Sequence, residues 1–447
     1  NKRKIYGGYA LNKLIIDKNP KDKIYQEYQY PDIDFYSSTP IEDLINICDI
    51  LHSKNYKRVN AKEAAHKDTY SIFVNFHLYC DITYVPKNIY NRIPYKELDG
   101  YNYTHPHFIT IDYLRILSDP LGSSWRIEKS IKRFTLLQKY YPLPIVNKPI
   151  SILNSTPEID KAIKIITQFL FNNKTCISIG FFAYNYFITY NNKNKSPIPI
   201  PYHEFISTNY KEDFKNIYDM LKKEMPESNF SYKEYYPFFQ FTGHSVEISI
   251  NDDVIAVIYT DNKKTLPYQV VSGNYIIGTF SLTLLYAQIM VMKYRTNNNN
   301  DMKEVYITMV SHLIKARNNY LDKHNKSILD KTIYQELITD KYMGHNIDAD
   351  RERFLLYESR RNKGKKSYYM YDPEQRNKQD KQESQDKEEV VKKDTSYIFS
   401  NCSGNLIKNI KNSQLTDKTK QESESETDEE IEMLYEDMIK RRSLKNS

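Results

Sequence analysis

Hydrophobic and polar positions along the chain follow two periods, one near two residues and one near 3.6, and the two kinds of run alternate. Residues 4–15 read KIYGGYALNKLI and predict a short strand, a diglycine turn and the start of a helix. Residues 30–38, YPDIDFYSS, predict a second strand, and residues 40–52 predict a helix. The apolar face of that helix would consist of Ile41, Leu44, Ile45, Cys48 and Leu51. This succession of strands and helices indicates an α/β fold.

Three later segments continue the pattern. Residues 69–85 read TYSIFVNFHLYCDITYV and predict one or two strands. The apolar positions there, which alternate with a polar set including His77 and Asp81, are Ile72, Val74, Phe76, Leu78, Cys80 and Ile82. Residues 123–144 predict a helix stopped by proline, with Ile127, Ile131 and Phe134 toward the core and Arg126, Lys129, Lys132 and Arg133 projecting outward. The uncharged run 275–292 approaches the length of a membrane span, but its Gly278 and Gln288 favour a buried strand, turn and helix.

Carboxylates gather at the strand positions of the first part of the chain. Alternate side chains of a strand point to the same side, so Asp32 and Asp34 lie together while Ile33 and Phe35 face the other way. Two anions held close repel each other unless a cation lies between them, and a divalent metal with oxygen ligands is the usual cation. An exposed edge or turn is the alternative for an isolated Asp-x-Asp. Asp81, on the polar face of its strand, adds a third carboxylate.

An internal repeat divides the chain. GGYALNKLI, from Gly7, reappears as GFFAYNYFI, from Gly180, and DFYSSTPIEDLINICDIL, from Asp34, reappears as EFISTNYKEDFKNIYDML, from Glu204. The same register places Tyr202 opposite Asp32 and an apolar residue near Val257 opposite Asp81. The second copy keeps one acidic residue, Glu204 opposite Asp34, and has lost the other two, so we expect it to have no metal site and to serve as a structural platform.

Charge and composition change this picture only in part. The net charge is +7, and the segment from Tyr371 to Ser447 holds 14 Lys and Arg against 18 Asp and Glu, which leaves +11 on residues 1–370. A basic body suits a polyanionic partner. The four cysteines, Cys48, Cys80, Cys176 and Cys402, have no paired spacing, so neither a zinc site nor a disulfide framework is expected. The chain begins at Asn1, so we expect the natural N-terminus to be missing.

The ordered motifs GGYALN, PDIDFYS, CDIT and SDPLGSSWRIEKSIKRFTLLQKYYPL resemble those of nucleotidyltransferases of the polymerase-beta kind. Their wording is similar to the poly(A) polymerase catalytic subunit of large DNA viruses, the group that includes poxviruses and giant viruses of amoebae. The motifs lie within residues 6–144, and the general resemblance extends to about residue 343. It implies two tandem nucleotidyltransferase modules, the first active and the second degenerate, that form a cleft.

The resemblance also implies a chemistry for individual residues. A polynucleotide adenylyltransferase adds adenylates from ATP to mRNA 3′ ends without a template, by in-line displacement with two divalent ions, Mg²⁺ or Mn²⁺. Asp32 and Asp34 would hold the ion bound to the triphosphate, and Asp81 would complete the site for the ion that activates the 3′ hydroxyl. Gly7 and Gly8 would approach the phosphates. Tyr9 follows them where many superfamily members have Ser, so backbone NH groups must make more of the phosphate contacts.

The basic residues Arg126, Lys129, Lys132 and Arg133 would contact the triphosphate or the RNA backbone. Trp125 would either stack on a base or pack in the core. Two other interpretations stay open, a metal-dependent glycosyltransferase that uses Asp-x-Asp and a non-catalytic RNA-binding or processivity protein. The first leaves Gly7, Gly8 and Asp81 unexplained.

We expect three parts: a catalytic domain over residues 1–150, a degenerate domain with a structural and RNA-binding role over residues 151–371, and a disordered charged tail over residues 372–447. The partners implied are an RNA 3′ end and ATP, with no membrane, and either a homodimer or a viral processivity subunit. The resemblance implies a location in the host cytoplasm, in the viral factory, and also in the virion.

Overall fold

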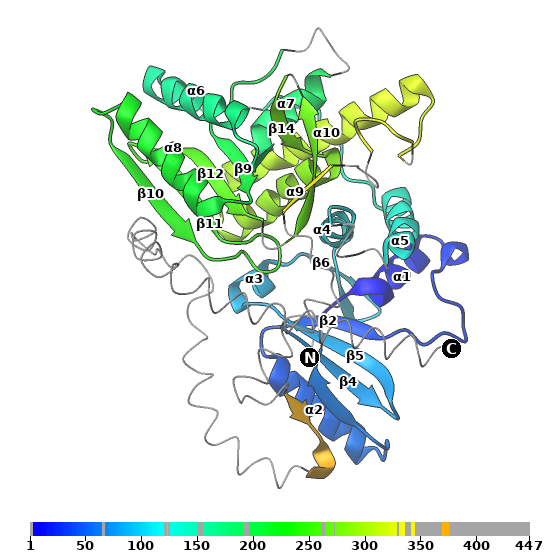
Figure 1. Cartoon of the computed structure of the whole chain (residues 1–447). Coiled ribbons are helices and arrows are strands. Elements are labelled where there is room, and N and C mark those ends of the chain that lie inside the picture. Colours follow the sequence, from blue (N-terminus) through cyan, green and yellow to red (C-terminus); the bar gives the residue numbers. More distant parts are fainter. Residues whose placement is uncertain are drawn as a thin grey trace, which may run out of the picture.

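The computed structural model describes residues 3–64, 68–119, 123, 126–150, 155–190, 196–261, 264–271, 273–328, 330–335, 341–344 and 369–375. They form two α/β modules, drawn in blue and cyan and in green and yellow in Figure 1. The predicted fold class is thus confirmed. Trp125 and the part of the predicted tail beyond residue 375 lie outside the described residues.

The first module is built on one mixed sheet. Its elements are β1 (Lys4–Tyr6), α1 (Gly7–Lys18), the 3₁₀ helix η1 (Pro20–Asp22), β2 (Ile33–Ser37), α2 (Pro40–Ser53), β3 (Asn60–Glu63), β4 (Thr69–Val74), β5 (His77–Tyr84), α3 (Lys87–Arg92), β6 (Tyr95–Leu98), β7 (Tyr101–Thr104), α4 (Pro106–Leu117) and α5 (Ile127–Tyr140). Helix α2 packs on β3, β4 and β5, and α1 packs on β2 and α5.

The second module repeats most of this succession after an additional first helix, but its described residues contain no counterpart of η1 or α3. Its elements are α6 (Pro157–Asn172), β8 (Cys176–Ile179), α7 (Gly180–Thr189), β9 (His203–Ser207), α8 (Tyr210–Glu224), β10 (Phe230–Tyr235), β11 (Ser245–Ile250), β12 (Asp253–Thr260), β13 (Thr265–Val271), β14 (Tyr275–Gly278), α9 (Phe280–Thr296), α10 (Asn300–His324) and β15 (Tyr342–Gly344).

The two sheets have the same topology, which confirms the repeat expected from the sequence. Seven strands of each sheet follow the same order, β3-β4-β5-β2-β1-β7-β6 and β10-β11-β12-β9-β8-β14-β13, and each corresponding pair runs in the same relative direction. The eighth strand differs, because it lies beside β3 in the first sheet and beside β13 in the second. Asp34 pairs with Asp81 on β5, and Glu204 pairs with Val257 on β12. The predicted apolar residue opposite Asp81 is therefore Val257.

Residues shared by the two copies hold corresponding contacts. The Ser37 hydroxyl donates to Asp43 over 2.5 Å, and the Ser207 hydroxyl donates to Asp213 over 2.6 Å, so each strand is tied to the following helix. Asp43 and Asp213 are both buried. Asn12 and Asn185 each accept a hydrogen bond from a backbone NH of the loop that follows, at Ile24 and Ile198. The repeated polar residues thus preserve the scaffold.

The alternation predicted across residues 72–82 is wrong at its centre. A tight turn at Asn75 and Phe76, both with positive φ, separates β4 from β5, and the register of the two strands shifts just before the turn, between Ile72 and Phe73. Turn and shift reset the alternation. Phe76 and Leu78 consequently lie exposed at the end of the hairpin, although the pattern placed them on the core face.

The chain returns to the first module near the end of the described residues. Strand β16 (Met370–Tyr371), followed by the 3₁₀ helix η3 (Pro373–Gln375), pairs with β3. The Tyr371 hydroxyl donates to Asp49 over 2.6 Å. The domain boundary predicted at residue 371 places β16 in the second domain, whereas β16 pairs with β3 in the sheet of the first module.

The modules meet through helices and aromatic rings. Helix α4 packs on α9, and the loop between β10 and β11 brings Phe239 to 6.2 Å from Tyr36 and Phe241 to 5.7 Å from Phe108, between ring centroids. Helix α9 is buried on nearly every side, and with β14 it confirms the strand, turn and helix predicted for residues 275–292. Among the described helices, none combines the length and hydrophobicity needed to cross a bilayer.

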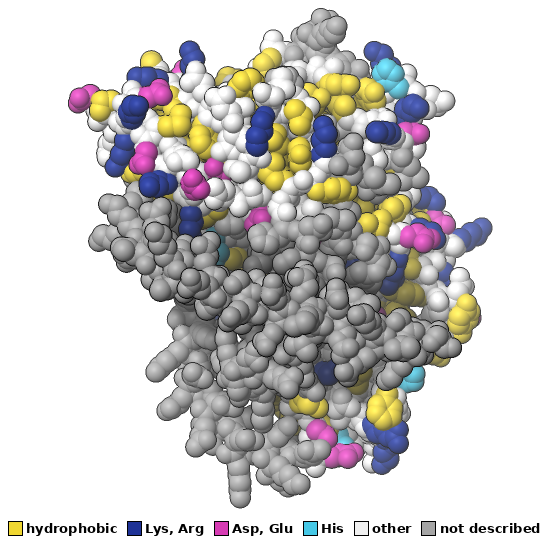
Figure 2. All heavy atoms as spheres, viewed as in Figure 1, with side chains coloured by type: hydrophobic (Ala, Val, Ile, Leu, Met, Phe, Trp, Pro, Cys, Tyr) yellow, Lys and Arg dark blue, Asp and Glu magenta, His cyan; other side chains and the backbone are white. Residues whose placement is uncertain are grey.

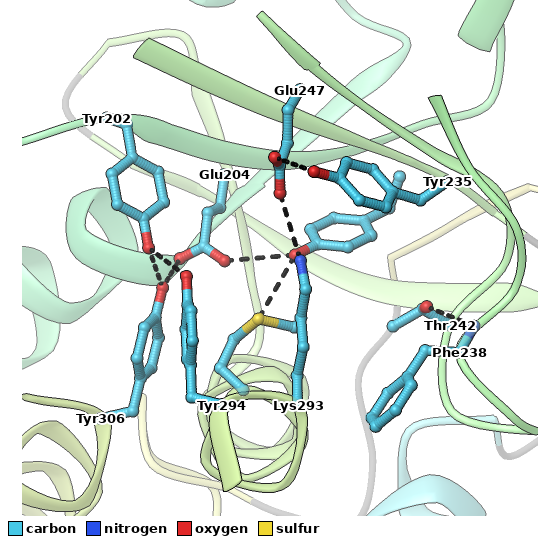
Figure 3. A network of polar contacts seen from close by, with 11 residues as sticks. Tyr202, Glu204, Tyr235, Phe238, Thr242, Glu247, Lys293, Tyr294 and Tyr306 are labelled. Carbon is cyan, nitrogen blue, oxygen red and sulfur yellow. Dashed lines mark hydrogen bonds and ion pairs between the residues drawn. The ribbon is translucent and has the colours of Figure 1, made fainter. Parts of the chain in front are cut away.

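A buried hydrogen-bond network occupies the degenerate end of the second sheet. Glu204, 2% exposed, accepts hydrogen bonds from the hydroxyls of Tyr306 over 2.6 Å and Tyr259 over 3.4 Å, and Tyr202 contacts the Tyr306 hydroxyl at 2.7 Å. Figure 3 shows Tyr202 and Tyr306 turned toward the Glu204 carboxyl. Burial raises the pKa of Glu204 to about 7. The hydrogen bond from the Tyr306 hydroxyl lowers this pKa and so offsets part of the effect of burial.

We predict that Glu204→Gln gains stability relative to the wild type as pH rises from about 4.5 to 7. The raised pKa means that folded Glu204 keeps its proton in a range where the unfolded chain releases it, so wild-type stability falls as pH rises. The difference in unfolding free energy should shift by about 3 kcal/mol in favour of the variant. Urea unfolding at pH 5 and pH 8 measures it, and a difference that stays constant or reverses would contradict the prediction.

Candidate active site

Three carboxylates converge at one end of the first sheet. Asp34 lies on β2, and Asp32 is the residue just before this strand begins. Asp81 is the partner of Asp34 on the parallel strand β5. One ligand oxygen from each lies within 4.8 Å of the others, and all three residues are half-buried. The strand pairing therefore brings together the three aspartates selected from the sequence.

The negative charges are incompletely balanced. Burial, followed by the charges of Asp32 and Asp81, holds the pKa of Asp34 well above its ordinary value. Burial also raises the pKa of Asp81, although a hydrogen bond from Ser71 opposes this and Asp32 adds to it. At such separations, each ionised pair costs roughly 3 kcal/mol or more at an effective dielectric constant of about 20. A divalent cation with oxygen ligands would relieve this repulsion, so the residues fit the metal that the sequence suggested.

Gly7 is required by its surroundings. Its φ is +72°, and a Cβ atom there would lie 2.0 Å from Asp34 Oδ2. Only glycine allows the backbone to approach the carboxylate so closely. Helix α1 begins at this residue, and neither a side-chain cap nor an acidic residue occupies its first turn. Its NH groups therefore present partial positive charge beside the triad.

Gly8 opens space for two side chains from elsewhere in the module. A Cβ atom there would lie 2.3 Å from the Tyr25 hydroxyl and 2.7 Å from an Arg133 nitrogen. Arg133 donates to the Tyr25 hydroxyl over 2.7 Å, and Asn12 accepts from the Tyr25 backbone NH over 3.4 Å. Phe181, buried, takes the place of Gly8 in the second module and lies 5.4 Å from Tyr202 between ring centroids. The degenerate copy thus fills this space with aromatic rings.

The predicted basic residues of α5 divide between two sides. Arg126 and Arg133 are half-buried, and both act on the pKa of Asp34. The pKa of Lys129 is lowered by its partial burial and by the positive charges of Arg133 and Arg126. The negative charges of Asp32 and Asp34 raise it and offset part of this effect. Lys132 instead pairs with Glu128 at 2.7 Å on the exposed surface of the helix. The outward orientation predicted for all four is therefore wrong for Arg133, which turns to the glycine turn.

Sequence reasoning missed two side chains beside the triad. The Ser71 hydroxyl donates to Asp81 Oδ1 over 2.6 Å from the opposite position on β4. Tyr25 belongs to a loop without regular structure, so periodicity gave no signal for it. The polar face of residues 69–85 contained Ser71, but only the pairing of β4 with β5 shows that it contacts Asp81.

Family models match both modules. Residues 1–123 match the family described as "Poly(A) polymerase catalytic subunit". Residues 135–417 match the family described as "APMV, Putative poly(A) polymerase, catalytic subunit, C-terminal".

Individual relatives agree with these families. A protein of Acanthamoeba polyphaga mimivirus named "Putative poly(A) polymerase catalytic subunit" is 38% identical over 445 residues, covering 91% of this chain and 75% of its own length. A protein of the same name from African swine fever virus is 30% identical over 148 residues, covering 32% of this chain and 31% of its own length.

A solved structure is similar as well. The crystal structure of the Megavirus polyadenylate synthase superposes with a TM-score of 0.82 at 36% identity, covering 90% of this chain and 82% of that protein. With matches in sequence and in fold that extend over both modules, the chain belongs to the family of poly(A) polymerase catalytic subunits.

Proposed function

We propose that this poly(A) polymerase adds adenylates from ATP to RNA 3′ ends at the site formed by Asp32, Asp34 and Asp81. The observation that carries the proposal is the convergence of these three carboxylates within 4.8 Å, beside a helix N-terminus with no acidic residue in its first turn. Two Mg²⁺ or Mn²⁺ ions held by the carboxylates would stabilise the attacking and leaving oxygens of an in-line displacement.

The residues of the chain supply binding and orientation. Asp32 and Asp34 would hold the ion on the triphosphate side, and Asp81, oriented by Ser71, the ion on the RNA side. Backbone NH groups at Gly7 and Gly8 would receive phosphate oxygens. Arg126, Lys129 and Arg133 lie on the side of α5 that faces the carboxylates, where their charge would attract the triphosphate. Lys132, on the exposed side, is assigned at most an outer contact with RNA phosphates.

The second module supports the first without a catalytic centre of its own. Its single acidic residue at the corresponding position, Glu204, is buried among tyrosine hydroxyls and faces Val257. The three positions that hold Asp32, Asp34 and Asp81 in the first module hold Tyr202, Glu204 and Val257 here, so only one of them offers a carboxylate to a divalent ion. We propose that this module serves as a platform for the catalytic module and for RNA.

The remaining partners follow from the same proposal. The two other functions left open by the sequence, a glycosyltransferase and a non-catalytic RNA-binding protein, find no support in the relatives. The relatives' designation as catalytic subunits supports association with a partner subunit, with a homodimer as the alternative. We propose the host cytoplasm, and the virion, as the location.

Incubation with a labelled RNA primer, Mg²⁺ or Mn²⁺ and each nucleoside triphosphate separately tests the reaction directly, and extension without preference for ATP would contradict it.

The two copies provide a matched pair of variants. We predict that Asp34→Asn lowers the rate of nucleotide addition by roughly a thousandfold or more, because several kcal/mol of transition-state stabilisation depend on the metal site. Glu204→Gln should keep the rate within a few-fold, because Glu204 pairs with the apolar Val257, where Asp34 pairs with Asp81. Primer-extension rates measure both, with circular dichroism as the folding control. Comparable losses would mean that the second module is catalytic.

We predict that Gly8→Ala lowers nucleotide addition by about 100-fold without loss of stability. The new methyl group displaces the Tyr25 hydroxyl and the Arg133 guanidinium from the site, and displacements of about 1 Å cost rates of this order. Alanine is the better helix former, so the helix itself is not weakened. The double variant Gly8→Ala/Tyr25→Phe should recover part of the rate, because the nearest clashing atom is gone. Full activity of Gly8→Ala would remove the glycine from the nucleotide site.

Neighbouring residues of α5 allow a comparison within one helix. We predict that Arg133→Ala raises the KM for ATP by about tenfold, the effect expected when a charge-assisted hydrogen bond is removed. Lys132→Ala should have a much smaller effect, because its partner is the exposed Glu128. Steady-state kinetics at saturating RNA distinguish the two, and equal effects would contradict the division of the helix into two sides.

A further inference from the structure

The end of the β4–β5 hairpin carries an unusual set of exposed side chains. Large apolar residues stand open to solvent there: Phe76 at 71%, Tyr56 at 50%, Tyr79 at 43% and Leu78 at 37%. Lys54, Lys57 and Arg58 lie exposed between them, and the Arg58 guanidinium lies 4.7 Å from the centroid of the Phe76 ring. Figure 2 shows hydrophobic, basic and histidine side chains together at the lower right of the molecule. We name the set Lys54, Tyr56, Lys57, Arg58, Phe76 and Tyr79 the hairpin patch.

The hairpin patch is continuous with the candidate active site. Tyr79 precedes Asp81 by two residues on β5, and the register shift leaves Tyr79 without a partner on β4, since Ile72 pairs with Cys80 and Phe73 with Leu78. Such bulges redirect side chains next to active sites. Phe76 lies five residues before Asp81, so the rise of an extended strand places it at most about 16 Å away. A chain bound at Asp81 therefore reaches the hairpin patch within a few nucleotides.

The second module lacks this surface, although its hairpin has the same geometry. Asn251 and Asp252 form the corresponding turn with the same positive φ angles as Asn75 and Phe76. The register places Asp252 at the position of Phe76 and the buried Ile255 at the position of Tyr79.

The neighbouring loop differs in the same way. The strand registers place Glu227, Ser228 and Asn229 where the first module has Tyr56, Lys57 and Arg58. Glu158 of α6 accepts hydrogen bonds there from the Ser228 hydroxyl over 2.5 Å and from the Asn251 amide over 3.0 Å. The scaffold alone thus does not require exposed aromatic or basic residues at this place. Only the copy with the three carboxylates carries them.

We propose that the hairpin patch binds single-stranded RNA immediately upstream of the 3′ end. This inference rests on the proposed function, because it assigns the surface to the RNA substrate of the same site. Aromatic rings interleaved with Lys and Arg are the combination that holds single strands, since rings stack on bases and cations neutralise phosphates. Asp81, the carboxylate assigned to the RNA side, lies on β5, which leads to the hairpin patch. The RNA would therefore run with its 3′ end at Asp81 and its preceding nucleotides toward the patch.

Binding of a fluorescent single-stranded RNA to the full chain, followed by anisotropy, tests the proposal. Phe76→Asn is a suitable variant, because asparagine adopts positive φ readily and adds no backbone strain. This variant and Tyr79→Ser should each weaken binding by about tenfold, as expected when a ring no longer stacks on a base. Asp252→Asn, the same turn position in the second module, is the matched control and should bind within twofold of the wild type. Thermal unfolding verifies the fold of each variant.

A second measurement separates the charges from the rings. Lys57→Ala/Arg58→Ala should reduce the slope of log affinity against log salt by about 0.7 for each phosphate that the protein no longer neutralises, whereas Phe76→Asn should leave the slope unchanged. In primer extension, the hairpin variants should raise the KM for RNA and leave the KM for ATP unaffected.

The outcomes distinguish this inference from the proposed function. If the wild-type protein extends primers and all hairpin variants bind RNA as tightly as it does, the hairpin patch is not an RNA surface. A change of oligomeric state in sedimentation velocity, with RNA affinity unaltered, would assign the patch to a protein partner and overturn the proposal. If the wild-type protein binds RNA through the patch but adds no adenylate with any metal, the proposed function fails and the RNA surface stands.

Discussion

The parallel pairing of β2 with β5 is the constraint on which the first module depends. It aligns Asp34 with Asp81, and the chain just before β2 adds Asp32, so three carboxylates lie within 4.8 Å. Their mutual repulsion opposes folding, and the remaining structure offsets it. Helix α2 covers the other side of the same strands with Leu44, Cys48 and Leu51, which are buried with Phe35 and Ile82. A rigid apolar side thus holds a charged side that would otherwise separate.

The second module shows what the same scaffold does without this charge cluster. Its sheet has the same strand order, and the same serine and aspartate pair ties strand to helix, but tyrosine hydroxyls and a phenylalanine fill the space beside Glu204. Buried polar groups need partners, and Tyr306 and Tyr259 provide them for the single remaining carboxyl. Glycine is kept at Gly180, where φ is +57° and a Cβ atom would lie 2.1 Å from Glu204. The second module therefore keeps the backbone geometry of the glycine turn although it lacks two of the three carboxylates.

The two copies also differ at two places beyond the triad, the glycine turn and the end of the hairpin. Beside Gly8 the first module has the polar pair Arg133 and Tyr25, whereas the rings of Phe181, Tyr202 and Tyr306 pack together at the corresponding place in the second. The hairpin end is aromatic and basic in the first module and acidic in the second. Helix α9 and the loop carrying Phe239 and Phe241 pack against the first module, so the two modules are joined by direct contacts.

The sequence by itself determined the features that depend on local periodicity. The alternation within β2 and β5 identified Asp32, Asp34 and Asp81, the diglycine marked the start of α1, and the repeat predicted a second module with an apolar residue opposite Glu204. Side-chain direction within one strand or helix is set by the backbone period, so these inferences needed no knowledge of neighbouring elements.

Only the tertiary structure decided which distant elements approach one another. It turned Arg133 toward Tyr25 while Lys132 stayed on the exposed side, brought Ser71 to Asp81, and returned β16 to the first sheet. The hairpin turn at Asn75 and Phe76 also interrupted an alternation that looked continuous in the sequence. Interactions of this kind depend on packing between segments far apart in the chain, and no periodic pattern within a single segment encodes them.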